Sequence, residues 1–239
     1  MAVYLGFPIS EELHARVLES VRRVREAPPE KGHTDFVTAT IIGMTDAGIG
    51  FFFSEMVGRM RLGKAADRIA AVTLKTVKGG LHLIIHKVGK GLSNEQFHPL
   101  VEFLEETLVV DDDTCRYVAF PATPELAGRI GEYRRLVREA PPATRHALQC
   151  LDLIVDFKHE SLEFFFRQST ERLQVRGWAG GAVSMGIEIA HRASNEPLKR
   201  LVPALTEESL LDIADFFGSI MLEQRMAEPG GLQSGGRGR

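Results

Sequence analysis

The chain matches itself, without a gap, when it is shifted by 113 residues. This offset pairs segments spread along each copy: 4–8 with 117–121, 25–29 with 138–142, 51–53 with 164–166, and 92–95 with 205–208. Chance can produce one short match, but several matches in a common register indicate a tandem duplication. No other sequence feature constrains the fold as strongly, because two related copies are expected to share one architecture.

The duplication predicts the domain organisation. We expect a first helical repeat over 1–116 and a second over 117–226, each long enough to form its own hydrophobic core. The remaining residues, 227–239, are rich in Gly and Arg, and we expect a disordered tail there.

Apolar residues recur at spacings of three and four, which is typical of helices. They predict five helices in the first repeat. Four of them span about 10–27, 33–62, 64–78 and 81–88, and the fifth begins at a capping box at 93–96. Gly79 and Gly80 predict the break between the third and fourth helices. Residues 2–7 and 115–120 are expected only as short extended leads. The predicted fold class is therefore all-α, a tandem duplication of a five-helix bundle-like unit.

Each predicted second helix carries three consecutive phenylalanines, at 51–53 and 164–166. Successive side chains on a helix point about 100° apart, so three in a row cover more than half of its circumference. A helix of this kind cannot bury all three rings against a single neighbour. We therefore expect a long Phe-rich central helix in each repeat, covered on most sides.

Composition narrows the function classes only slightly. The formal net charge of −3 gives no reason to expect a nucleic-acid partner. Cys115 and Cys150 do not coincide under the offset, which favours a reducing compartment and a cytoplasmic protein. The apolar run 36–53 has the length of a membrane span, but its counterpart at 149–166 contains several charged residues. We therefore expect a buried helix and no membrane span.

Three Glu-x-x-His pairs have the spacing of di-iron helical bundles, because residues three apart share a helix face. They are Glu11/His14, Glu95/His98 and Glu188/His191, and they fall at different positions of the two copies. No site recurs, so we expect no metal and no cofactor. The sequence has no nucleophile motif and no phosphate-binding loop, and no catalytic residue is predicted. A metal-dependent helical-bundle enzyme remains the third interpretation.

A stripe of small residues marks a candidate interface on the second helix of the first repeat: Gly43, Ala47, Gly50 and Ser54. The corresponding positions of the second repeat hold charged residues. Glycine inside a helix costs roughly 1 kcal/mol relative to alanine, so two glycines there suggest close packing. We expect this face to lie under the third helix of repeat two or under a second chain.

Two polar pairs lie in the apolar phase of the second helices: Glu55 with Arg59, and Gln168 with Arg172. A desolvated guanidinium needs a carboxylate or several acceptors. Glu55 supplies a carboxylate in the first repeat, whereas Gln168 is neutral. Arg172 is therefore a candidate site for an outside anion, the alternative being that it reaches solvent beyond the helix end.

These features favour a non-catalytic soluble scaffold or regulatory protein that acts through helix packing between repeats or between chains. A protein partner or self-association is therefore expected. The alternative is a small-molecule binder that holds an apolar ligand or a tetrapyrrole beside the Phe triplets: Phe51, Phe52, Phe53, Phe164, Phe165 and Phe166. A cavity next to residues 51–53 would favour this alternative.

Overall fold

The computed structural model describes residues 3–26, 33–90, 92–111, 115–139, 144–172 and 202–223, with isolated positions between 181 and 199. These residues are mostly helical, which confirms the helical character expected from the sequence. Four short strands also form a small sheet, which the sequence analysis did not predict beyond short extended leads. The expected tail at 227–239 lies outside the described residues.

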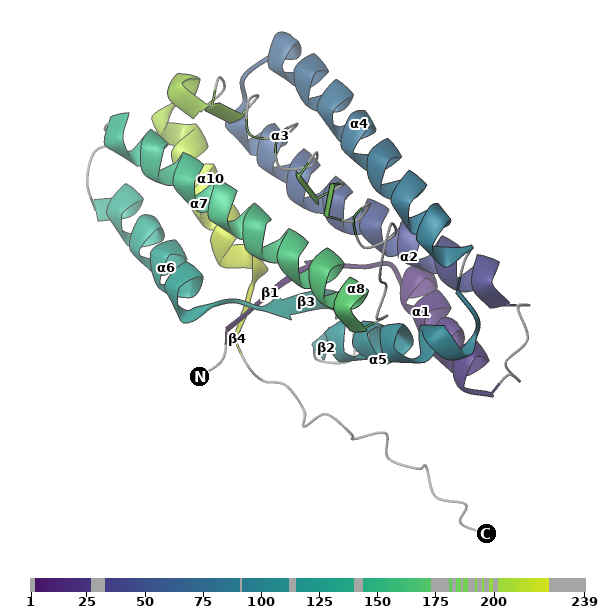
Figure 1. Cartoon of the computed structure of the whole chain (residues 1–239). Coiled ribbons are helices and arrows are strands. Elements are labelled where there is room, and N and C mark those ends of the chain that lie inside the picture. Colours follow the sequence, from purple (N-terminus) through teal and green to yellow (C-terminus); the bar gives the residue numbers. More distant parts are fainter. Residues whose placement is uncertain are drawn as a thin grey trace.

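The first half contains β1 (Val3–Pro8), α1 (Glu11–Glu26), α2 (Thr34–Ile49), the π-helix η2 (Gly50–Glu55), α3 (Met56–Met60), α4 (Lys64–Gly89), the 3-10 helix η3 (Glu95–Phe97), α5 (His98–Thr107) and β2 (Leu108–Asp111). The second half contains β3 (Cys115–Pro121), α6 (Pro124–Glu139), α7 (Thr144–Leu162), the π-helix η4 (Glu163–Gln168), α8 (Ser169–Arg172), the 3-10 helix η5 (Val202–Ala204), α10 (Glu207–Ile220) and β4 (Met221–Glu223). The long helices α2, α4 and α7 extend away from the sheet (Figure 1).

Several element bounds recur at the 113-residue offset. Shifted by that amount, α1 has the bounds of α6, and η2 has the bounds of η4. The predicted second helix at 33–62 is observed as α2, η2 and α3 in direct succession. The predicted capping box is also present: the Ser93 N–H donates to Gln96 Oε1 at 2.8 Å, and the Gln96 N–H donates to Ser93 Oγ at 3.3 Å.

The sheet joins the two halves of the chain. Its strand order is β2-β3-β1-β4, and all neighbouring strands are antiparallel. At its centre Gly6 pairs with Ala119, the residue 113 positions later. Shifted by 113 residues, β1 corresponds to β3 and β2 corresponds to β4. The pair β1·β4 then has the same register as the pair β3·β2. Each half therefore adds its last strand to the first strand of the other half.

Gly6 allows the central strands to approach closely. A Cβ at this position would lie 2.8 Å from Leu222 Cδ1 and 3.1 Å from Ala119 Cβ. A larger residue would therefore require the Leu222 side chain to move and the Ala119 methyl group to give by a few tenths of an ångström. The sequence analysis missed the sheet because its strands are short and their partners lie far away in the chain.

The helix α4 is continuous over 26 residues, so the predicted break at Gly79 and Gly80 is wrong. Both glycines are exposed, and a Cβ on either would meet nothing within 4 Å. Each glycine costs about 1 kcal/mol, but the inward-facing apolar residues continue in phase from Val77 to Leu81. Packing of that face keeps the helix intact, since tertiary contacts supply most helical stability.

One described helix, spanning Thr34–Met60, is long and apolar enough to cross a membrane. It comprises α2, η2 and α3, and here it packs against α1, α4 and α10. The core helix of a soluble protein can have the same length and composition as a membrane span. Length and composition therefore do not assign this helix to either class.

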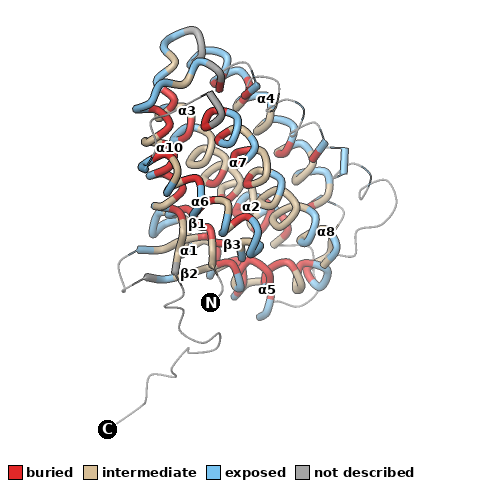
Figure 2. The backbone as a smooth tube through the Cα atoms, turned by 90° about the vertical axis from the view of Figure 1, so that its left-hand side faces the viewer, coloured by how far each residue is buried: buried red, intermediate tan, exposed pale blue. Residues whose placement is uncertain are grey.

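Aromatic rings connect the two halves in the core. Phe51 packs against Phe216 with ring centroids 5.7 Å apart, and Phe164 packs against Phe103 at 5.1 Å. Each contact joins the π-helix of one half to the last helix of the other. Phe103 and Phe216 are almost fully buried, and Figure 2 shows buried residues concentrated along α5.

Candidate functional site

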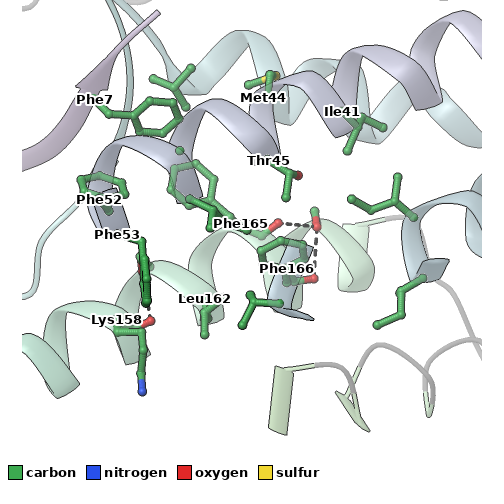
Figure 3. A pocket seen from close by; sticks show the side chains of 18 of the residues that line it. Phe7, Ile41, Met44, Thr45, Phe52, Phe53, Lys158, Leu162, Phe165 and Phe166 are labelled. Atoms are coloured by element: carbon green, nitrogen blue, oxygen red, sulfur yellow. Dashed lines mark hydrogen bonds between the residues drawn. The ribbon is translucent and has the colours of Figure 1, made fainter. Parts of the chain in front are cut away.

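An apolar cavity of about 240 Å³ lies beside both Phe triplets. The elements α2 and η2 form one wall and α7 and η4 form another, with α4 and α5 contributing further residues. Figure 3 shows Ile41, Met44 and Thr45 on one side, Leu162 and Lys158 on the other, and Phe165 and Phe166 between them. The cavity therefore lies where the two central helices meet.

The π-helices direct the rings of each triplet towards different neighbours. The first ring packs on the last helix of the other half, as described above. The second rings, Phe52 and Phe165, approach Phe7 with centroids 5.3 and 6.4 Å apart, and they also reach the cavity. The third rings, Phe53 and Phe166, line the cavity. The rings therefore have neighbours on more than one side, although no residue of either π-helix is fully buried. Such π-helical turns often occur at functional sites.

Few polar groups line this cavity, and several already have partners. Ser161 Oγ donates to the Lys158 carbonyl at 3.0 Å, and Ser169 Oγ donates to the Phe165 carbonyl at 2.7 Å. Thr38 differs, since it is only 4% exposed and its Oγ1 has no hydrogen-bond partner among the described residues. Leaving a buried hydroxyl unpaired costs about 1–3 kcal/mol. The Oγ1 atom is enclosed by packing against Gly89 of α4, so the hydroxyl is not open to the cavity.

Lys158 carries the one ionisable side chain among the described residues that line the cavity. Burial lowers the pKa of its ammonium from 10.5 to about 8. Its Nζ donates a hydrogen bond to Asn195 Oδ1. In Figure 3 the carbon stem of Lys158 lies beside Phe53, while Nζ points away from the rings. The stem thus adds to the apolar wall and the charge lies at the edge of the site.

Arg59 and Glu55 form the predicted intrahelical pair, with Arg59 Nη2 3.7 Å from Glu55 Oε2. The Arg59 guanidinium also lies over the Phe216 ring, 5.4 Å from its centroid. Neither residue lines the cavity. Arg59 therefore belongs to the contact between α3 and α10, with the exposed Glu55 beside it, and both lie outside the apolar site.

The prediction that Arg172 lacks an anion is wrong. Arg172 Nη2 lies 2.7 Å from Glu106 Oε2, and the guanidinium lies 4.9 Å from the centroid of Phe103. Gln168 is exposed. Glu106 belongs to α5 of the first half, so a partner from the other half was invisible to spacing within one helix. Arg172 has a carboxylate and needs no outside anion.

The small-residue stripe contacts neighbours from its own half. A Cβ on Gly43 would lie 3.3 Å from Leu13 of α1, and one on Gly50 would lie 3.8 Å from Lys78 Nζ of α4. Ala47 packs against the core cluster around Phe7, and Ser54 is exposed. The stripe is thus met by side chains of α1 and α4, and no backbone of another described helix comes within 4 Å of a Cβ on Gly43 or Gly50. Most of the expected partner, the third helix of repeat two, lies outside the described residues.

The described residues contain no group of three His, Cys, Asp or Glu side chains that could hold a metal ion. His82 of α4 is half-buried and forms a 3.0 Å hydrogen bond to Asp46 of α2, and Asp46 also lies 3.3 Å from Lys78 Nζ. This cluster joins α4 to α2.

Sequence reasoning missed Lys158 and Thr38 as residues of the site. Lys158 lies four residues before Leu162 and seven before Phe165, so it shares their helix face. A lysine in an apolar phase was the signal that could have identified it. Thr38 gives no such signal, because threonine is common on buried helix faces. Comparisons with protein-family models, curated proteins and solved structures found no match to this chain.

Proposed function

We propose that this protein binds a small apolar molecule in the cavity between its central helices. The observation that carries the proposal is the cavity of about 240 Å³ lined by Phe53, Phe166 and other apolar side chains. An engineered apolar cavity of about 150 Å³ in another protein is large enough to bind benzene. Ligand sites are typically apolar, with a few polar groups that fix orientation. Lys158 contributes its carbon stem to the apolar wall, with its charge at the edge of the site.

Fluorescence of a neutral apolar probe, N-phenyl-1-naphthylamine, tests the proposal in the full chain. The probe is expected to bind with saturation, and Leu162→Trp is expected to weaken binding at least tenfold because the larger ring fills the cavity. Leu148→Trp is the matched control, since Leu148 lies on the same helix and is exposed. Equal binding by wild type and both variants would contradict the proposal.

A second function, self-association through the outer face of α4, is favoured by a separate observation. Ile69, Val72 and Leu83 are exposed large apolar residues on this helix, at 46%, 67% and 56%. Exposed apolar residues gathered on one element are typical of interaction surfaces. A mass measurement in solution tests this: a dimer that Val72→Glu converts to monomer supports the proposal, and a monomeric wild type at high concentration would refute it.

We further propose that the chain arose by tandem duplication of a unit of about 113 residues and acts in the cytoplasm. The recurring bounds of α1 and η2 and the register of Gly6 with Ala119 support the duplication. Cys115 and Cys150 do not coincide under the 113-residue offset, which supports a reducing compartment. A localisation experiment with a tagged chain tests the second point.

A further inference from the structure

We infer that the ligand of this cavity is a neutral molecule with a hydrocarbon body and one oxygen atom, which accepts a hydrogen bond from the Thr45 hydroxyl. Long-chain alcohols and ketones belong to this class. The inference rests on the proposed binding of an apolar molecule and specifies the chemistry of that molecule. The observation that carries it is the hydroxyl of Thr45, which has no partner among the described residues and lies in an otherwise apolar wall.

The other hydroxyls that the described residues bring to the cavity wall are not available as donors. Those of Ser161, Ser169 and Thr170 donate to backbone carbonyls three or four residues earlier in the chain. A hydroxyl has one proton to donate, so these three cannot also donate to a ligand. The Thr38 hydroxyl is enclosed against Gly89 and does not reach the cavity.

Thr45 differs from these side chains in position and in bonding. It is half-buried, and its Oγ1 is not among the enclosed atoms. In Figure 3 the Thr45 side chain points from α2 towards Phe165 and Phe166 on the opposite wall. A ligand oxygen near Thr45 can therefore accept a hydrogen bond while the hydrocarbon body of the ligand contacts the rings.

The surroundings favour a neutral ligand over an ion. Lys158 carries the one charge among the described lining residues, and its Nζ points away from the rings (Figure 3). A carboxylate or an ammonium between the rings would lose its hydration with no opposite charge to compensate, which is costly. A neutral alcohol or ketone loses much less hydration, and Thr45 replaces one of its hydrogen bonds to water.

The two related walls differ at this point, which gives the ligand an orientation. The residue that corresponds to Thr45 under the 113-residue offset is Lys158. Both residues line the cavity, but Lys158 contributes only its carbon stem. The polar contact therefore comes from the α2 wall, and the oxygen of the ligand is expected to lie there.

Displacement of N-phenyl-1-naphthylamine by octan-1-ol, octan-2-one and octane tests the hydrogen bond. Thr45→Val keeps the branched shape of the side chain and removes the hydroxyl. It should weaken the binding of octan-1-ol and octan-2-one by about three- to tenfold, because one net hydrogen bond is lost. The binding of octane should change by less than about twofold, since octane makes no hydrogen bond. Each value is corrected for the affinity of the probe for the same variant.

Thr38→Val is the matched control, because it makes the same change at a lining residue whose hydroxyl is enclosed. It should leave the relative affinities of the three ligands unchanged. Octanoate and octylammonium test the requirement for neutrality. In wild type, both should need a concentration at least about tenfold higher than octan-1-ol to displace the probe.

The outcomes separate the two proposals. If neither the probe nor the neutral ligands bind wild type, the apolar-ligand proposal itself fails. If Thr45→Val changes the binding of octan-1-ol and octane by the same factor, the cavity binds apolar molecules but Thr45 does not select an oxygen, and the inference is wrong. Displacement by octanoate at the concentration needed for octan-1-ol would also overturn it, because a cation would then have to face the cavity.

Discussion

Phe103→Ala is expected to destabilise both halves of the protein together. Phe103 is 2% exposed, and it contacts Phe164 at 5.1 Å and the Arg172 guanidinium at 4.9 Å, both in the other half. Truncating a fully buried phenylalanine to alanine costs about 3–5 kcal/mol. The aromatic pair accounts for about 1 kcal/mol of that loss, and the cation–π contact contributes less, since Arg172 is partly exposed.

Urea unfolding followed by two probes tests this expectation. Far-UV circular dichroism reports on all helices, whereas the single tryptophan, Trp178, belongs to the second half of the sequence. Because Phe103 connects the halves, both signals should shift to a lower midpoint by the same amount and remain coincident. Leu148→Ala, at an exposed site, should change the free energy of unfolding by less than about 0.5 kcal/mol. An unchanged Trp178 midpoint in Phe103→Ala would refute the reasoning.

Two further predictions concern single sites. Burial lowers the pKa of Lys158 from 10.5 to about 8, so the unfolded chain binds more protons than the folded one between these values, and this residue's contribution to stability rises with pH across that window. The wild type bears the cost of the buried ammonium at pH 7.5 and largely loses that cost at pH 10. The gain in free energy of unfolding of Lys158→Met over wild type should therefore be larger at pH 7.5 than at pH 10, by on the order of 1–2 kcal/mol after allowing for solvent screening. Urea titrations that give the same gain at both pH values would contradict this. Ala47→Glu should lower the free energy of unfolding by about 1–3 kcal/mol, because Ala47 packs on the cluster around Phe7, whereas Ser54→Glu at an exposed position should have little effect; equal melting temperatures for the two variants would count against the packing described here.

Local signals in the sequence predicted the helices well. The capping box at 93–96, the first helix and the long Phe-rich helix are all determined by neighbours within one or two turns, and periodicity records such neighbours directly. The break predicted at Gly79 and Gly80 was wrong because local sequence did not determine the structure there. A breaker signal is local, whereas the packing that keeps α4 continuous comes from other elements.

Contacts between the halves could not be predicted from spacing. The carboxylate of Glu106 reaches Arg172 from 66 residues away in the chain, and the sheet pairs residues at the two ends of the sequence. The candidate site was predicted only in part: the Phe triplets were identified as its wall, but Lys158 was not identified as a lining residue. Its place in the cavity wall depends on how the two central helices pack, which spacing within one helix does not record.

The exchange of strands between the halves has a consequence for synthesis of the protein. Among the described strands β1 is the first to leave the ribosome, and one of its two partners, β4, is the last. The edge of β1 that β4 covers must stay unpaired until nearly the whole chain has emerged. Pairings between distant segments form slowly, and an uncovered strand edge can pair with another chain. Nascent chains that stall before residue 221 should therefore be the species most prone to aggregate, and they should depend most on chaperones.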